Sequence, residues 1–448
     1  MPSTPLDSLL FRDMFGTAAM RAVFADEALV GRYLEVEVAL ARAEARCGVI
    51  PPEAADAIAR AADGIAIDWE RMRRETENVG YPILALVHQL AEAAGEAGRY
   101  VHWGATTQDI MDTANVLQLR AALDLVAADI EALRGILAAL AAKHRDTPMA
   151  GRTHLQQALP ITFGYKVAIW LSAMDRHAER LEQLRPRALM GQFAGAAGTL
   201  ASLGEDGFRV QQAFCEELGL HQPPITWHVA RDGLVEAVSF LGLVTGSLAK
   251  IATDMMLMMS SEFGGEVMEP FVKGRGASST MPQKRNPISS ELMLATAKAV
   301  RQQVALMLDG MVQDFERATG PWHLEWLALP ESFILAAGCL EQAKFALSGL
   351  TVDAARMRSN LDMTGGLIVA EAVMMAAAPA LGRQHAHDVV YDACRAAITS
   401  GRTLAEALIE VPEVVEALGG REGVEARCDP ANYLGLAPRM VDRVLAGR

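Results

Sequence analysis

The sequence contains few cysteines, and they stand far apart. Its 448 residues include five cysteines and no CxxC pair. Disulfide frameworks occur in cysteine-dense secreted domains, and zinc sites need cysteine or histidine ligands at short spacing. We therefore expect free thiols, no metal site and a cytoplasmic protein. The cysteines are Cys47, Cys215, Cys339, Cys394 and Cys428.

Positive charge is also scarce. The chain has 41 Lys and Arg against 55 Asp and Glu, so its formal net charge is −14. A protein with this charge has no global attraction to nucleic acid or to an anionic membrane surface. We expect neither as a partner, although a local basic pocket for a small anion remains compatible with the composition.

No long hydrophobic run is free of charged residues or proline. The two most apolar stretches, 237–259 and 365–381, are both interrupted in this way, which favours buried helices over membrane spans. Residues 1–15 lack a basic segment followed by an apolar run, so we expect no secretory signal.

Strand signals are sparse, whereas helical periodicity is strong. Few Val, Ile and Thr residues alternate, and no Asn-Gly turn joins two apolar runs. Apolar residues instead recur at alternating steps of three and four along 116–140, 163–184, 241–258 and 340–350. Seams of this period pack long helices almost parallel. The pattern predicts an all-α fold with a central bundle of long helices.

Helix breakers divide the chain into three predicted domains. Residues 1–105 form an amino-terminal helical domain that ends near Gly104 and a run of threonines. Residues 106–355 form the central helical bundle and contain a polar loop at 264–287. Residues 356–448, where prolines are frequent, form a carboxy-terminal helical domain.

Two short segments that resist the helical pattern are rich in polar groups. The segment 104–109 contains Thr106, Thr107, Gln108 and Asp109, and taken alone it is best explained as a helix N-cap. The segment 151–160 places His154 among Arg, Thr and Gln residues. That setting makes His154 a better acid or base candidate than the other nine histidines.

A third segment, 274–287, carries the most chemistry. Its two prolines and two glycines forbid a helix. An exposed linker would explain those residues, but not three hydroxyls beside Lys284, Arg285 and Asn286. Lys284 and Asn286 suit a carboxylate whose neighbouring carbon loses a proton, and a serine oxygen suits the base that takes it. A phosphate-binding P-loop is excluded, because no GxxxxGK[ST] pattern follows a strand.

The stretch from Ser278 to Pro287 reads SSTMPQKRNP and resembles the SSxMPxKxNP signature of the fumarase/aspartase superfamily. Its members include adenylosuccinate lyase, argininosuccinate lyase and 3-carboxy-cis,cis-muconate cycloisomerase. Residues 106–109 resemble the first signature region of the family and 153–156 the second. The resemblance covers nearly the whole chain in order. It implies an all-α homotetramer with neither a metal nor an organic cofactor.

The resemblance also implies roles for single residues. Ser278 would be the catalytic base, and Lys284 and Asn286 would bind a substrate carboxylate. Thr107 would contact the substrate, and His154 would assist proton transfer or hold the departing group. Arg317 is a candidate for a second carboxylate, with a structural salt bridge about as plausible. The remaining predicted substrate-binding residues are Thr106, Gln108, Thr153, Gln156, Ser279 and Met281.

Within the superfamily, the chain looks closest to the cycloisomerase and adenylosuccinate lyase branch. Segments 192–200, 227–232 and 315–331 look like the cycloisomerase, and 80–86 lacks the His-Asp pair usual in adenylosuccinate lyases. His154, however, stands where bacterial lactonizing members often have Trp, and it is the residue that C–N and C–O lyases use.

Three functions therefore stay open. The first is a cycloisomerase of aromatic catabolism that acts on a small polycarboxylate by addition or elimination beta to a carboxylate, through an aci-carboxylate. The second is a C–N lyase that releases fumarate from an amino- or imino-dicarboxylate. The third is a non-catalytic structural bundle, and the intact set of Ser278, Lys284, Asn286 and His154 speaks against it.

Helix length predicts where the active sites lie. An unbroken helix over 113–143 would be about 45 Å long at 1.5 Å per residue. Thr107 precedes its start and His154 follows its end, yet one active site needs its groups within hydrogen-bond reach of one substrate. If both residues are catalytic, they come from different subunits, and the active sites are composite.

Overall fold

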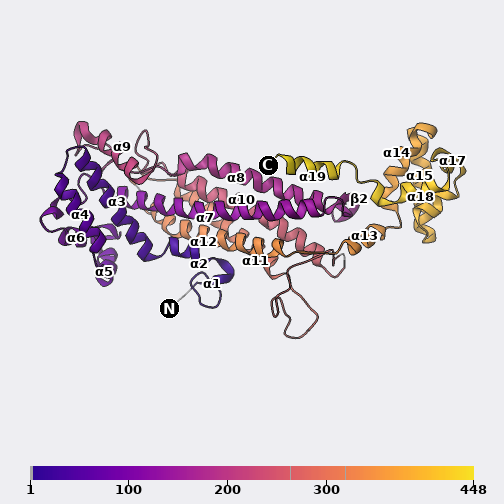
Figure 1. Ribbon diagram of the computed structural model, residues 1–448, viewed down its shortest axis with the longest axis horizontal. Helices are drawn as coiled ribbons and strands as arrows, with labels where there is room; N and C mark the ends of the chain where they lie inside the picture. The colour runs from indigo at the N-terminus through magenta and orange to yellow at the C-terminus, as the bar shows by residue number, and fades with distance from the viewer. Residues whose placement is uncertain (1–3, 263, 318, 448) are drawn as a thin grey trace. The chain divides into compact units, whose positions relative to one another are not determined.

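The computed structural model describes residues 4–262, 264–317 and 319–447 (Figure 1). Residues 1–3 at the start of the predicted first domain, Ala318 of the segment 315–331, and Arg448 lie outside these ranges. The described chain forms two compact units. Unit 1 comprises residues up to 131 together with 177–249 and 292–342, and unit 2 comprises 132–176, 250–291 and the residues from 343 onward.

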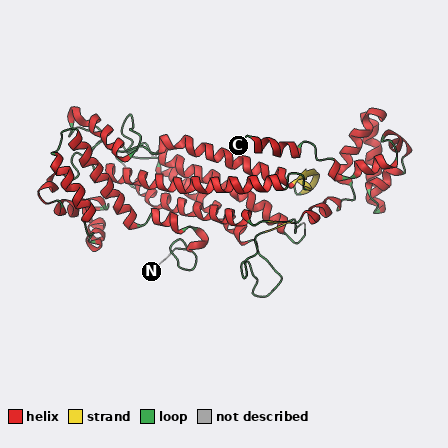
Figure 2. Cartoon of the chain, in the orientation of Figure 1, coloured by secondary structure: helices red, strands yellow, loops and turns green. Residues whose placement is uncertain are grey.

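Helices dominate both units, and the predicted all-α class is confirmed (Figure 2). The helices that lie wholly in unit 1 are α1 (Arg12–Phe15), α2 (Ala18–Val23), α3 (Asp26–Arg46), α4 (Pro52–Gly64), α5 (Trp69–Val79), α6 (Ile83–Ala93) and α9 (Gly207–Leu218). Five long helices contribute residues to both units: α7 (Thr107–Lys143), α8 (Phe163–Ala188), α10 (Asp232–Met259), α11 (Ile288–Gly310) and α12 (Pro321–Ser348).

Unit 2 holds the remaining elements. Its helices are α13 (Ala354–Asp362), α14 (Ala370–Leu381), α15 (Arg383–Ser400), α16 (Leu404–Ile409), α17 (Pro412–Ala417), α18 (Arg421–Cys428) and α19 (Ala437–Ala446). Its strands are β1 (Pro148–Thr153), β2 (Gln156–Thr162), β3 (Val267–Met268) and β4 (Thr351–Val352), paired antiparallel as β1 with β2 and β3 with β4. The three-domain division along the chain stays a prediction, since each unit is assembled from three separate stretches.

The predicted helical seams are the buried stripes of the long helices. All eight seam residues of α7, from Val116 to Leu140, are buried, and so are those of α8 and α10. α7 begins at Thr107, six residues before the predicted start, because the carboxylate of Asp109 accepts a 3.0 Å hydrogen bond from the free N–H of Thr106. Periodic burial of apolar side chains therefore accounts for the long helices.

α10 is the one described helix long and apolar enough to cross a membrane. Its most apolar window has a mean hydropathy of 1.6, and 61% of that window is buried within the fold. The helices α13 and α14, with the turn before α14, pass the same test only as a pair bent by 82°. The burial of α10 agrees with the buried helix predicted over 237–259.

Smaller apolar clusters support the short helices of each unit. In unit 1, α3, α4 and α6 share a core that includes Ala41, Ile58 and Leu90. In unit 2, Val373 and Leu408 belong to a core formed by α14 to α18. Each cluster holds a peripheral group of helices together.

The hairpin of β1 and β2 was not expected. Thr153 pairs with Gln156, and the two residues between them, His154 and Leu155, have φ angles of 50° and 61°. Two consecutive positive φ angles define the tight turns that favour Asn and Gly. The sequence indicated only that 151–160 is not helical, and it gave no hairpin signal because neither turn residue is of that kind.

Candidate functional site

In unit 1 the first polar segment is held by one buried carboxylate. Asp109 is fully buried and accepts hydrogen bonds from the N–H groups of Thr106 (3.0 Å), Ala194 (3.1 Å) and Gly195 (2.9 Å). The imidazole Nε2 of His228 lies 2.7 Å from the same carboxylate. Asp109 therefore joins the start of α7 to two segments that are distant in sequence, around residues 194 and 228.

A second buried network lies one helical turn further along α7. The guanidinium of Arg231 makes two hydrogen bonds to Asp112, at 2.7 and 2.8 Å, and two to Glu325, at 2.7 and 2.5 Å. Burial lowers the pKa of Arg231, but the charges of Asp112 and Glu325 outweigh it, so this pKa lies above its ordinary value. This network was not predicted from the sequence, where 227–232 and 315–331 were noted only for their family resemblance.

The predicted residues of unit 1 have different surroundings. Thr106 accepts a hydrogen bond from the guanidinium of Arg317, so these two predicted residues lie together. Thr107, the residue after Thr106, is half-buried. Gln108 is buried, and its amide nitrogen donates to Asp112 at 3.1 Å and to the carbonyl of His228 at 2.9 Å. Gln108 therefore contributes hydrogen bonds to the buried network.

In unit 2 the tip of the hairpin presents the second segment. Thr153, His154 and Gln156 are exposed there. Just below the tip, Arg152 makes two hydrogen bonds to the buried carboxylate of Glu266, at 3.0 and 2.7 Å. The amide of Asn360 donates to the same carboxylate at 2.7 Å. This buried anchor gives the hairpin a defined position within unit 2.

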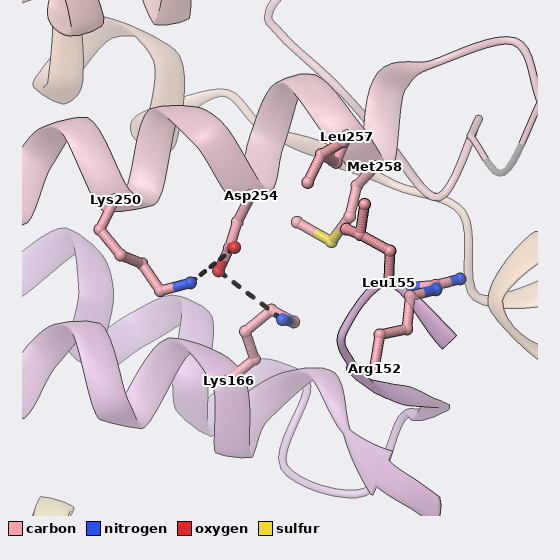
Figure 3. Close-up of a pocket in the computed structure, with 7 residues that line it drawn as sticks. All are labelled: Arg152, Leu155, Lys166, Lys250, Asp254, Leu257 and Met258. Carbon is pink, nitrogen blue, oxygen red and sulfur yellow. Dashed lines mark hydrogen bonds and ion pairs between the residues drawn. The ribbon is translucent and has the colours of Figure 1, made fainter. Parts of the chain in front are cut away.

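A cavity of about 150 Å³ adjoins the hairpin (Figure 3). Asp254 lies between two lysines, 2.6 Å from the Nζ of Lys250 and 3.7 Å from that of Lys166. Burial lowers the pKa of Lys166, and the charge of Asp254 offsets only part of that effect. The residues that line the cavity are Arg152, Leu155, Lys166, Lys250, Asp254, Leu257 and Met258.

The third segment is a loop closed at its base. Ala277 bridges Arg285, and the N–H of Asn286 donates to the carbonyl of Gly276 at 2.9 Å. Gly276 has φ 69°, and a Cβ atom there would lie 2.5 Å from the carbonyl oxygen of Asn286. Only glycine fits this position, because a side chain would force the two strands of the loop apart.

The loop also has a buried anchor. The carboxylate of Glu269 accepts hydrogen bonds from the N–H groups of Ser289 (3.1 Å) and Ser290 (2.8 Å) and from the hydroxyl of Ser290 (2.7 Å). A carboxylate on free N–H groups at the start of a helix is a stable arrangement, so Glu269 secures the loop where it enters α11.

Within the loop, the hydroxyl of Ser278 lies among hydrogen-bond donors. Its oxygen accepts from the backbone N–H of Thr280 at 3.3 Å and from that of Met281 at 3.1 Å. Two N–H dipoles directed at one oxygen stabilise negative charge on it. Ser279, Met281 and Lys284 are exposed in the same loop, and Asn286 is half-buried.

Other polar side chains weighed in the sequence have ordinary partners. All five cysteines are free thiols. His385 and His387 are exposed and lie beside Glu413 and Asp388. No group of three or more His, Cys, Asp or Glu that could hold a metal ion occurs among residues 4–262, 264–317 and 319–447. The absence of a metal and of a cofactor stays a prediction.

The chain matches known families over most of its length. Residues 15–302 match a family described as lyase, and residues 366–444 match one described as adenylosuccinate lyase C-terminus. The 3-carboxy-cis,cis-muconate cycloisomerase of Pseudomonas aeruginosa is 48% identical over 98% of this chain and 96% of its own length. Trans-aconitate decarboxylase 1 of Mycosarcoma maydis is 47% identical over 97% of this chain and 88% of its own length.

Solved structures of related proteins share the fold of this chain. The crystal structure of fumarate lyase from Mesorhizobium sp. BNC1 superposes with a TM-score of 0.92 at 56% sequence identity, covering 97% of this chain and 99% of that one. Similar identities therefore connect this chain to proteins named for three different reactions, all over nearly the whole length.

Proposed function

The chain belongs to the fumarase/aspartase superfamily and is an enzyme of it, and from this premise we propose that it catalyses addition or elimination beta to a carboxylate, in the manner of 3-carboxy-cis,cis-muconate cycloisomerase. The observation that carries the proposal is the environment of Ser278, whose oxygen accepts two backbone N–H groups. Such an oxygen tolerates negative charge and is therefore suited to take a proton from carbon.

The reaction has two steps in the elimination direction. The deprotonated oxygen of Ser278 takes the proton from the carbon next to a carboxylate and becomes a hydroxyl, and the electron pair of the broken C–H bond moves into that carboxylate. The resulting aci-carboxylate is stabilised by the ammonium of Lys284 and the amide of Asn286. The pair then returns to form a C=C bond while the bond to the beta substituent breaks, and His154 protonates or holds the departing group.

In the addition direction the same steps run backwards. A carboxylate oxygen of a carboxymuconate attacks the beta carbon, and the electron pair of the C=C bond moves into the aci-carboxylate. That attack forms the C–O bond of the lactone, and the hydroxyl of Ser278 then gives its proton to the alpha carbon, which restores the carboxylate. Three cations, Arg152, Lys166 and Lys250, line the cavity next to the hairpin with one carboxylate, Asp254, and this excess of positive charge supports a polycarboxylate as the substrate class.

A second candidate is a lyase that releases fumarate from an amino- or imino-dicarboxylate. It is favoured by His154, which is exposed at the tip of the hairpin, and by the 56% identity to the solved fumarate lyase. The decarboxylase relative shows that a third outcome must be measured.

One panel of substrates separates these functions. The purified enzyme is incubated with 3-carboxymuconate, adenylosuccinate, argininosuccinate, iminodisuccinate and trans-aconitate, and the release of lactone, fumarate and CO₂ is followed. We expect lactone from 3-carboxymuconate at the highest kcat/KM. Fumarate from one of the dicarboxylates at a higher kcat/KM would establish the second candidate, and CO₂ from trans-aconitate would contradict both.

We also propose a cytoplasmic homotetramer with composite active sites. α7 is unbroken over 37 residues, about 55 Å at 1.5 Å per residue, with Thr107 at its first residue. Four of the long helices expose large apolar side chains that a second copy would cover, Ile169, Leu243, Leu257, Leu308 and Leu327. The five free thiols support the cytoplasmic location.

Mixed oligomers test the composite sites. Thr107→Ala and His154→Ala are each expected to be inactive alone. If each active site takes these residues from two different subunits, hybrids made from equal amounts of the two variants should recover about a quarter of wild-type activity. About half of the sites receive an intact Thr107, and about half of those also receive an intact His154. Subunit exchange is verified with two affinity tags. Hybrids that stay inactive would show that both residues come from one subunit.

A further inference from the structure

Helix α3 carries polar side chains on a face buried inside unit 1. Tyr33, Glu37 and Glu44 are spaced by four and seven residues and so share one face of the helix, and none is more than 2% exposed. Buried carboxyl groups are costly unless they are paired or protonated. Two of them on one helix face therefore require an explanation.

The two carboxyl groups differ in their partners. One oxygen of Glu37, Oε1, lies 2.6 Å from Nδ1 of His102. The other oxygen of Glu37 and both oxygens of Glu44 are buried without a hydrogen-bond partner among the described residues. His102 is thus the single cationic partner that this pair has within the described part of unit 1, and it serves Glu37.

The charges follow from this geometry. Burial, and then the charge of Glu37, raise the pKa of Glu44 to about 9, so Glu44 holds a proton at neutral pH. Burial lowers the pKa of His102, but the charge and hydrogen bond of Glu37 and the charge of Asp109 outweigh it, so the net shift is upward. A buried carboxylate 2.6 Å from Nδ1 favours the protonated, cationic form of the ring.

His102 stands next to the predicted substrate-binding segment. It precedes Thr106 by four residues, and 20% of its side chain is exposed. Its φ angle is 61°, a conformation that costs energy in residues other than glycine and that occurs often at functional sites. One ring nitrogen faces Glu37, and the other, Nε2, has no hydrogen bond among the described residues, so it is available as a donor.

We propose that Glu37 is a positioning residue that fixes His102 as a cationic donor to a carboxylate of the substrate, and that Glu44 is its protonated neighbour, which leaves Glu37 as the one charged group of the pair. This inference rests on the proposed function for its substrate class. It adds His102 to the predicted Thr106 and Thr107 contacts and gives the buried face of α3 a role in binding.

Two isosteric substitutions on the same helix test the proposal. Glu37→Gln keeps the shape of the side chain and removes its charge, whereas Glu44→Gln imitates the protonated carboxyl that is already there. Binding of propane-1,2,3-tricarboxylate to the intact oligomer is measured by calorimetry from pH 5.5 to 9. Because the ligand does not react, this measurement does not depend on the identity of the substrate or on Ser278.

We expect Glu37→Gln to weaken binding at least about tenfold at pH 7.5, and Glu44→Gln to change it less than about twofold. Binding should also weaken with rising pH as His102 loses its proton, and in Glu37→Gln this loss should begin at lower pH. The charged groups that face His102 are Glu37 on α3 and Asp109 on α7, and only the first is changed. A purely structural role of Glu37 would not move this pH dependence.

Three results would overturn the proposal: unchanged binding and pH profile in Glu37→Gln, a loss in Glu44→Gln as large as that in Glu37→Gln, or no binding of the tricarboxylate to the wild type. Failure of the proposed function alone looks different. In that case no substrate of the panel is turned over, while the tricarboxylate still binds and the two variants still differ as described.

Stability measurements test the proton on Glu44 separately. The pKa of an unperturbed Glu is 4.5, and burial raises that of Glu44 to about 9 in the fold. From pH 4.5 upward the unfolded chain loses this proton while the folded chain keeps it, so wild-type stability falls with rising pH until about pH 9. Gln does not titrate. The Tm of Glu44→Gln should therefore exceed that of the wild type at pH 8, and the difference should shrink toward pH 5. A Tm difference that is the same at pH 5 and at pH 8 would show that the fold does not raise the pKa of Glu44.

Discussion

Replacing Ser278 by alanine is expected to lower kcat by at least about 10³-fold, because the change removes the atom that takes the proton from carbon. The fold should not change. The loop is closed at its base by Gly276 and Asn286 and anchored by Glu269, and none of these contacts involves the hydroxyl of Ser278. Steady-state kinetics on the best substrate of the panel measures the effect, with circular dichroism and sedimentation as checks on structure.

Thr280→Ala is the matched control for this loss. It also removes one hydroxyl from the exposed part of the loop, but it keeps the backbone N–H that donates to Ser278. Its kcat should stay within about threefold of the wild type, as for a surface change away from the reacting atoms. If Ser278→Ala turned over substrate as fast as Thr280→Ala does, another group would be the base.

Replacing Arg231 by methionine is expected to cause the largest loss of stability, about 3–5 kcal/mol. The guanidinium is fully buried and is the cation between Asp112 and Glu325, which are also buried. Its removal would leave two carboxylates facing each other in a low-dielectric interior. Unfolding in urea, followed by circular dichroism, measures the change.

Two comparison variants separate this effect from the loss of any arginine. Arg187→Met breaks an ion pair with Glu236 in which both side chains are exposed, 57% and 37%, and it should cost far less stability than Arg231→Met. The triple variant Arg231→Met, Asp112→Asn, Glu325→Gln removes all three charges together and should be more stable than Arg231→Met alone. A loss in Arg231→Met no larger than that in Arg187→Met would show that the buried network contributes little.

Much of the fold was predictable because its cause is local. The seam of α7 from Val116 to Leu140 repeats at helical spacing, and apolar groups at that spacing form a stripe along one face of the helix. Exposing this stripe to water is unfavourable, so every seam residue is buried. The hairpin at His154 was not predictable in this way. Its turn residues carry no glycine or asparagine signal, and the anchor through Glu266 lies 114 residues away from Arg152.

The candidate site also has one part that was predictable from local sequence and one part that was not. The loop at 274–287 was recognised because its prolines, hydroxyls and cations are neighbours in sequence. Their chemistry can therefore be inferred from the order of residues alone. Gln108 was grouped with the substrate-binding residues because of its position in the same segment. In the fold its amide nitrogen is bonded to Asp112 and His228, which a pattern of neighbours does not reveal.

By itself, then, the sequence determined the helical class, the long helices and the chemistry of the loop that carries Ser278 and Lys284, since periodicity and local composition are properties of short stretches of chain. Tertiary structure alone decided that Glu37 faces His102 across 65 residues and that Arg231 joins partners 119 and 94 residues away. The physical reason is that a buried charge selects its partner by distance in space and by the loss of water around both groups.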